Sequence, residues 1–165
     1  MSRPSENIAY EELQWQGIHH IALVTRDLEA TLDFYVNLLG MQAGEIFPAV
    51  KGRGRHCFVK PGDTKTWGVH FFEYKEAQIF QSAETLKRLS KEPISEDLYR
   101  FLPGALQHIA FALPSEDNAL ALRDNLRLHG VVMTDIYNLG SIRNYIFIDN
   151  NGIQLEAAWP SNQTG

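Results

Sequence analysis

Apolar and polar residues alternate along several short stretches of the chain, and a period of two predicts β-strands. In the first stretch, residues 18–25, Ile21 and Leu23 share one face of the expected strand. His20 lies on the other face, followed by smaller residues. The bulkier face is suited to packing on a helix, so the opposite face has room beside the histidine.

A helical pattern follows this strand. Apolar side chains recur at three-to-four spacing over residues 28–39, and Gly40 suits the position just past the helix end. The carboxylate of Asp27 is a suitable N-cap for this helix. Further strands are expected at residues 41–48, 56–60 and 66–74, so the first half predicts the order β-α-β-β-β.

The second half predicts the same order of elements. Ser115 is a suitable N-cap for a helix that ends at Gly130, and Asp-Asn-Asn-Gly at 149–152 is a strong hairpin signal. A connecting segment at about 76–104 is expected to contain a linker helix. The strands expected in the second half are residues 107–113, 131–137, 145–149 and 153–159.

The two halves also repeat in sequence. The run that opens the first half returns in the second, as His20-Ile21-Ala22-Leu23 and His108-Ile109-Ala110-Phe111. An internal repeat is the sequence signature of a duplicated structural unit. We therefore predict one α+β domain over residues 1–165, built from two tandem βαβββ modules at about 17–75 and 105–160.

Length and composition fit a globular protein of this kind. The 165 residues are 44% hydrophobic and 21% charged, and the net charge of −5 favours neither nucleic acid nor an anionic membrane as a partner. No apolar run is long enough for a membrane span. The single cysteine, Cys57, excludes an internal disulfide framework, so a reducing, cytoplasmic setting is expected.

Four side chains of the repeat have the chemistry of metal ligands. His20 and His108 occupy equivalent places, and each half closes on an acid within an apolar strand, Glu73 and Glu156. If the modules pack around a pseudo-twofold axis, these side chains meet in one cleft. Two imidazoles with one or two carboxylates suit one divalent ion, such as Fe, Mn, Co, Ni or Zn.

Other polar residues could contact a substrate. Arg55 and Arg143 precede aromatic strands at matched positions and could attract an anion, and Tyr145 could donate to a bound oxygen. His56 and His70 could act as groups behind the ligands or as a general base. In each case a purely structural role is the alternative.

The motifs resemble those of the vicinal oxygen chelate superfamily, which includes glyoxalase I, extradiol dioxygenases, fosfomycin-resistance enzymes and bleomycin-binding proteins. The resemblance covers roughly residues 17–160 and rests on the His-Ile-Ala openings, the Leu-Leu-Gly-Met helix end, the turn at 149–152 and the Leu155-Glu156 strand. It implies paired modules whose mixed sheets curl around a metal, with His20, His108 and Glu156 as ligands and Glu73 as the additional carboxylate of glyoxalase-like members.

The resemblance implies an enzyme whose small substrate chelates the metal through two neighbouring oxygens. The first expectation is a glyoxalase-like lyase or isomerase, which Glu73 favours. In such an enzyme, Glu73 or Glu156 could also serve as the base for proton transfer. The alternatives are an extradiol-type dioxygenase, in which His20, His108 and Glu156 hold Fe(II), and a non-catalytic binder of antibiotic-type molecules. Whether the modules pair within one chain or across a homodimer stays open, since the family uses both arrangements.

Overall fold

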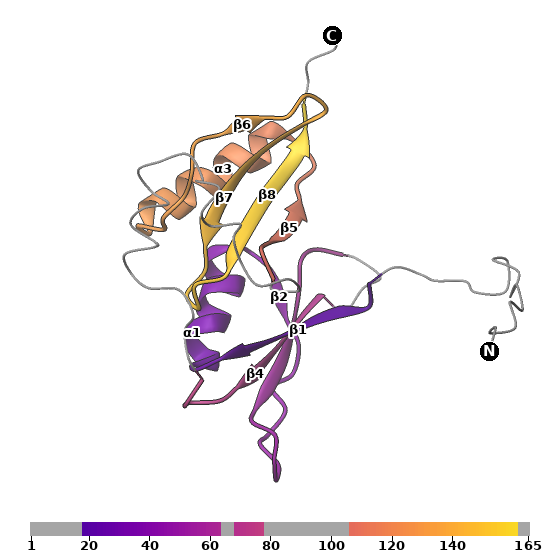
Figure 1. The fold of residues 1–165 in the computed structure, drawn as a ribbon, viewed down its shortest axis with the longest axis vertical. Coiled ribbons are helices and arrows are strands. Elements are labelled where there is room, and N and C mark those ends of the chain that lie inside the picture. Colours follow the sequence, from indigo (N-terminus) through magenta and orange to yellow (C-terminus); the bar gives the residue numbers. More distant parts are fainter. Residues whose placement is uncertain (1–17, 64–67, 78–105, 162–165) are drawn as a thin grey trace, which may run out of the picture.

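The computed structural model describes residues 18–63, 68–77 and 106–161, and these residues form two similar modules. Each module contains one four-stranded mixed sheet with a helix against it (Figure 1). The predicted α+β class and the two βαβββ modules are therefore confirmed. The predicted linker helix falls on residues 78–105, which lie outside the described part of the chain.

Module one runs from β1 to β4. Its elements are β1 (His20–Thr25), α1 (Leu28–Leu32), the π-helix η2 (Asp33–Leu38), β2 (Gln42–Ala43), β3 (His56–Lys60) and β4 (Gly68–Glu73). The strand order in the sheet is β1-β4-β3-β2, with β1 parallel to β4 and the other pairs antiparallel.

Module two has the same topology. Its elements are β5 (Ile109–Ala112), α3 (Glu116–Leu128), β6 (Tyr137–Asn138), β7 (Ile142–Ile148) and β8 (Gln154–Pro160). The strand order is β5-β8-β7-β6, and β5 is parallel to β8 as β1 is to β4. In both modules the strand that opens the repeat lies at the edge of its sheet.

The predicted helix signals hold, with one difference. Asp27 accepts a hydrogen bond from the Ala30 amide, and Ser115 accepts one from the Asn118 amide, so both act as N-caps. Gly40 has a φ of 71°, as its place after a helix end requires. The helix predicted over 28–39 changes to a π-helix after Leu32, and within that segment Tyr35 is fully buried.

The least accurate predictions concern the strands that follow each helix. Strands were predicted over 41–48 and 131–137, but β2 and β6 each contain two residues. Gly44 and Pro48 weaken regular pairing in the first segment, because glycine packs no side chain and proline has no amide hydrogen. An isolated bridge from Met133 to Phe147 replaces a continuous ladder in the second.

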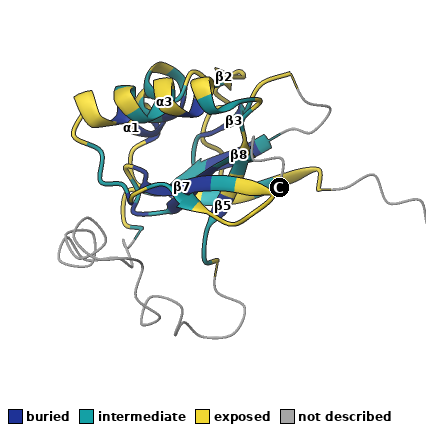
Figure 2. Cartoon of the chain, turned by 90° about the horizontal axis from the view of Figure 1, so that it is seen from above, coloured by how far each residue is buried: buried dark blue, intermediate teal, exposed yellow. Residues whose placement is uncertain are grey.

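The two modules contact each other on their helical sides. The β7–β8 turn lies against module one, where Asn151 accepts a hydrogen bond from Thr25 at 2.8 Å and donates one to Thr31 at 3.0 Å. The Tyr35 hydroxyl donates to Asp149 at 2.9 Å. Figure 2 shows α1 and α3 on the same side of the molecule, with buried strands beneath them. The predicted turn at 149–152 is thus also a contact between the modules.

One apolar core supports this arrangement. Buried side chains between each helix and its sheet form a single cluster, to which module one contributes Leu28, Tyr35, Val69 and Phe71 and module two contributes Leu126, Tyr145, Leu155 and Trp159. In the described part of the chain, no helix has the length and apolar character needed to cross a membrane.

Candidate functional site

The strand registers decide which residues of the two modules are equivalent. In module one Ala22 pairs with His70, and in module two Ala110 pairs with Glu156. Ala22 and Ala110 are the matched alanines of the sequence repeat. The counterpart of Glu156 is therefore His70, and Glu73 lies three residues further along β4. Since an odd step along a strand changes the face, Glu73 points to the opposite side of the sheet from His70.

Each sheet has one face that packs on its helix and a second face, called here the open face, that points away from it. On the open face of module one, histidines from three neighbouring strands lie in a row. His20 on β1 and His70 on β4 have ring centroids 5.7 Å apart. Beyond them, Nδ1 of His56 on β3 is 2.8 Å from Nε2 of His70, a hydrogen-bond distance. His20 is exposed, whereas His56 and His70 retain 6% and 7% exposure. The row therefore runs from an exposed imidazole at His20 to buried imidazoles at His70 and His56.

The environment keeps the inner two rings neutral. Burial, together with the neighbouring His56 and His20, lowers the pKa of His70 to about 4. Burial and Arg53 also lower the pKa of His56 below its usual value. At neutral pH both imidazoles therefore carry one proton each, and only one of the two can donate in the bond between them.

On the open face of module two, Glu156 is held by two polar side chains. Its Oε2 lies 3.0 Å from Nε2 of His108, and its Oε1 accepts a hydrogen bond of 2.6 Å from Asn144. Glu156 is 8% exposed, so burying its charge requires partners of this kind. Nδ1 of His108 is buried and has no hydrogen-bond partner. The structure thus brings two of the predicted ligands, His108 and Glu156, into direct contact.

The pair of His108 and Glu156 fits the chemistry of a metal site. Two ligands bound to one ion at about 2.1 Å lie roughly 3 Å apart, which is also the distance of a hydrogen bond. A hydrogen bond from Asn144 orients the carboxylate, as groups behind a metal ligand do. The unpartnered nitrogen of His108 is a second donor atom that nothing in the described chain satisfies.

Glu73 is not brought near the histidines. Its carboxylate receives hydrogen bonds from Arg55 at 2.8 Å to each oxygen and from the Leu28 amide at 3.1 Å. The guanidinium of Arg55 is the main cause of the lowered pKa of Glu73. With Asp27 and Glu29 it makes the one group of three possible metal-binding side chains within 4.8 Å of each other among the described residues. Arg55 occupies this group, so Glu73 has a structural role in the present geometry.

The predicted substrate-binding residues also have partners inside the chain. Arg55 bridges Glu73 to Glu29 in the first turn of α1, and Arg143 pairs with Glu116 in the first turn of α3. The matched arginines thus tie each helix start to its sheet. Tyr145 is fully buried and donates to the backbone oxygen of Ala119 at 3.0 Å, and burial raises the pKa of its phenol. Tyr145 therefore faces the helix.

His20 does not complete a metal site with His108 and Glu156 in one chain. Within the described residues, no set of donor atoms that includes these three side chains comes within 4.8 Å of one another. The modules meet on their helical sides, whereas these residues lie on the open faces of the edge strands β1 and β5 and of β8. The described chain therefore keeps His20 apart from the pair of His108 and Glu156.

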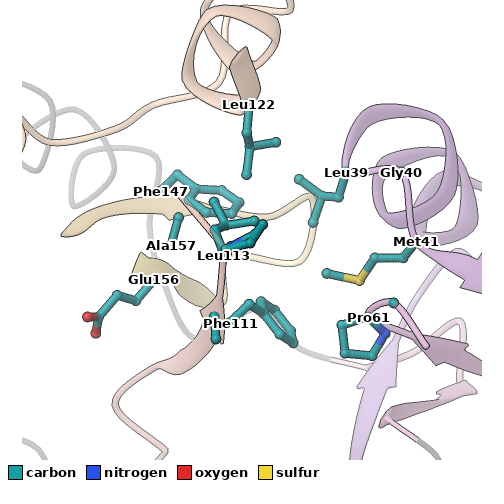
Figure 3. Close-up of a pocket in the computed structure, with 13 residues that line it drawn as sticks. Leu39, Gly40, Met41, Pro61, Phe111, Leu113, Leu122, Phe147, Glu156 and Ala157 are labelled. Atoms are coloured by element: carbon teal, nitrogen blue, oxygen red, sulfur yellow. The ribbon is translucent and has the colours of Figure 1, made fainter. Parts of the chain in front are cut away.

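A hollow of about 250 Å³ is lined by residues of both modules. Its walls are mainly apolar, with Leu39 and Met41 from module one and Leu122 from α3. Figure 3 shows the carboxylate of Glu156 pointing away from these side chains. Glu156 and Ala157 of β8 are among the residues that line the hollow, but the carboxylate of Glu156 is directed away from its apolar walls.

Sequence patterns alone missed two features of the site. Matching residues by type paired Glu73 with Glu156, although the alternation within β4 already places His70 on the face opposite to Glu73. Asn144 carried no signal, because a single amide in a strand has no distinctive spacing. Its role follows only from the register of β7 and β8, which sets it diagonally across from Glu156.

Comparison with known proteins agrees with the geometry. No curated protein matches the chain in sequence. Among solved structures, a glyoxylase/bleomycin resistance protein/dioxygenase domain from a Frankia species has a TM-score of 0.67 at 19% identity, covering 90% of this chain and 100% of that one. Similarity below 25% identity establishes the fold but not the activity.

Two further structures show the range of functions on this fold. A fosfomycin resistance protein from Listeria monocytogenes has a TM-score of 0.58 at 18% identity, covering 90% of this chain and 97% of that one. An antibiotic binding protein from a Streptomyces species has a TM-score of 0.60 at 19% identity, covering 90% and 99%. The sequence profile of one family matches residues 17–157. The chain therefore belongs to the Glyoxalase/Bleomycin resistance protein/Dioxygenase superfamily.

Proposed function

We propose that the protein is a divalent-metal-dependent enzyme whose small substrate binds the ion through two adjacent oxygens. The observation that carries the proposal is the contact between the buried Glu156 and the partly buried His108, in which the carboxylate is oriented by Asn144 and one imidazole nitrogen has no partner. His20 supplies the third ligand. An ion from the group Fe, Mn, Co, Ni and Zn would act, when bound, as a Lewis acid on the substrate oxygens.

The proposal includes a homodimer that joins half-sites from two copies. The face of β1 that carries His20 is open, and Val24 on the same face is 50% exposed. Leu106, just before His108, is also 50% exposed. Exposed apolar side chains around polar groups favour a protein interface. Packing β1 of one copy against β5 and β8 of the other would bury these side chains and bring His20 to His108 and Glu156.

The residues of the open faces would have distinct roles. His20, His108 and Glu156 would hold the metal, and Asn144 would keep the Glu156 carboxylate in its orientation. His70, beside His20, would face the bound substrate with a neutral ring. The phenyl rings around His70, such as Phe58 at a centroid distance of 3.7 Å, would exclude water from that side.

Two chemistries remain within this class. Glu73 was the reason to favour a glyoxalase-like lyase or isomerase, and Arg55 holds that carboxylate on the helical face. The remaining set of two histidines and one carboxylate is the ligand set of non-haem Fe(II) oxygenases. Loading the protein with Fe(II) anaerobically and adding catechol with oxygen separates the two. Ring-cleaved product identifies the dioxygenase, and conversion of an α-ketoaldehyde–thiol adduct identifies the glyoxalase-like enzyme.

Non-catalytic binding of a planar small molecule is the second candidate function. It is favoured by the incomplete donor set of a single chain and by the aromatic side chains on the open face of module one, including Phe47, Phe58 and Phe72. A monomer that takes up no metal, yet binds an aromatic antibiotic, would support this function and contradict the enzyme.

Mixing two variants tests the composite metal site. His20→Ala and His108→Ala each remove a ligand from every site, so neither homodimer should retain metal. If sites form between copies, a heterodimer of the two variants has one site with both histidines intact. Unfolding and refolding the mixture should restore about a quarter of the wild-type metal content at random pairing. Recovery of no metal, with heterodimers verified by mass spectrometry, would contradict the composite site.

A further inference from the structure

The bond between His56 and His70 is unusual because it joins two buried side chains of the same type. The rings lie on adjacent strands, with Nδ1 of His56 at 2.8 Å from Nε2 of His70. Both rings are held between phenyl groups. Phe47 stacks on His56 with an interplanar angle of 18°, and Phe58 stacks on His70 with an angle of 19°. Packing of this kind leaves the two rings little freedom to turn.

The remaining nitrogens of the pair differ in their surroundings. Nε2 of His56 is fully buried and has no hydrogen-bond partner. Nδ1 of His70 also has no partner among the described residues, but it is not sealed from solvent. The pair therefore has one closed end at His56 and one open end at His70, which lies on the side of His20.

Two proton arrangements are possible, and the closed end distinguishes them. If His70 donates to His56, the proton of His56 must be on Nε2, where a buried N–H has no acceptor. If His56 donates from Nδ1, its Nε2 is a bare lone pair without a donor. A buried N–H without an acceptor is rarer in folded proteins than an acceptor without a donor. The faces of the flanking phenyl rings lie against the ring of His56, so they do not accept from its edge.

We infer that His56 is a positioning residue that donates its Nδ1 proton to His70 and thereby fixes the proton of His70 on Nδ1. His70 then presents a hydrogen-bond donor at the open end, and neither of its nitrogens offers a lone pair to a metal. The inference rests on the proposed function for the identity of the acceptor, which is an oxygen of the substrate bound beside His20. His70 thus selects substrates with an acceptor oxygen, although it occupies the strand position of the ligand Glu156.

Nitrogen-15 NMR of the full-length, histidine-labelled protein tests the inference without any ligand. Two-bond correlations between ring nitrogens and carbon-bound protons distinguish a protonated Nδ1 from a protonated Nε2, and His→Asn variants assign each ring. We expect both His56 and His70 to carry their protons on Nδ1 in the metal-free protein. A proton on Nε2 of His70 would overturn the inference.

Two substitutions of His56 provide a matched pair. His56→Phe keeps an aromatic ring between Phe47 and Phe72 but removes the donor, so His70 should lose its fixed proton position and give the averaged signals of a free imidazole. His56→Asn places an amide donor near the position of Nδ1 and should restore the Nδ1 proton of His70. An unchanged His70 pattern in His56→Phe would overturn the inference. If His56→Phe fails to fold, the wild-type spectrum and His56→Asn still decide.

Addition of zinc ion alone separates this inference from the proposed function. We expect zinc to shift the ring nitrogens of His20 and His108, while His70 keeps its Nδ1 proton. If the nitrogens of His70 shift as ligands, the inference is wrong and the metal site stands. If His20 and His108 do not respond, the proposed metal site is wrong, and the proton position of His70 is judged by the metal-free spectra.

Discussion

Module one and module two have the same topology, but they carry different side chains at two matched positions of their last strands. On the open face, His70 in module one corresponds to Glu156 in module two. Three residues later, on the helical face, Glu73 corresponds to Trp159. The carboxylate thus lies on the helical face of the sheet in module one and on the open face in module two. The two modules thus share one strand register, but the polar side chains placed at equivalent positions of that register differ between them.

On the helical faces, the matched arginines have different partners in the two modules. Arg55 forms two hydrogen bonds of 2.8 Å with Glu73, whereas Arg143 lies over the ring of Trp159, 5.8 Å from its centroid. Both arginines also pair with a glutamate in the first turn of the adjacent helix. An arginine paired with one glutamate at a helix start can therefore have either a second carboxylate or an aromatic ring as its other partner. Both arginines thus have partners within the chain, and their contact with a substrate stays a prediction.

The largest expected effect is on metal binding, and it separates the two acids. Replacing Glu156 with Gln removes the charged ligand, so metal affinity should fall by about 100-fold or more. Replacing Glu73 with Gln should leave affinity and stoichiometry unchanged, because that carboxylate binds Arg55 on the other face. Metal content after dialysis against graded chelator measures both. Loss of metal in Glu73→Gln, with the protein folded, would restore Glu73 as a ligand.

The next effect is a pH dependence in which two groups oppose each other. Burial raises the pKa of Asp149 to about 6, so its contribution to stability is present at low pH and is lost as pH rises from about 4 to 6. Burial lowers the pKa of His70 to about 4, so its contribution is present at high pH and is lost as pH falls from about 6.5 to 4. Over this window the two contributions change in opposite directions.

Asp149→Asn removes one of the two contributions and makes the other visible. In metal-free protein, the unfolding free energy of this variant should fall more steeply on acidification than that of the wild type, by about 2–3 kcal/mol between pH 6.5 and 4. Urea titrations at several pH values measure the difference. Parallel curves for the two proteins would show that Asp149 does not titrate in this range.

The contacts between the modules were only partly predictable from sequence. The repeat, the caps and the alternation in 18–25 predicted both βαβββ modules and the open face of His20, since these signals are local. The turn at 149–152 was also predicted, but not its contacts with Thr25 and Thr31, because they join residues about 120 positions apart. Local patterns specify the elements, and the register and the module contacts specify the site.

Tyr35→Phe tests the contact between the modules with a smaller effect. The substitution keeps the buried ring but removes the 2.9 Å hydrogen bond to Asp149, which is 5% exposed. Leaving a buried carboxylate with one partner fewer should lower the unfolding free energy by about 1–3 kcal/mol. Phe34→Tyr, at the adjacent partly buried position, is a control that adds a hydroxyl without touching this contact. Equal stability of Tyr35→Phe and wild type would show that this hydrogen bond adds no net stability, because the hydroxyl is bonded equally well to water in the unfolded chain.

The smallest effect compares the two N-caps, which differ in charge. Asp27→Ala and Ser115→Ala each remove the acceptor for one amide at a helix start, and each should cost about 1 kcal/mol. The cost at Asp27 should change with salt, because its carboxylate also interacts with the charged groups of Glu29, Glu73 and the helix dipole. The cost at Ser115 should not change, since a hydroxyl carries no charge. Unfolding curves at low and high sodium chloride measure both, and a salt-independent cost at Asp27 would mean that Arg55 already balances the acidic group around it.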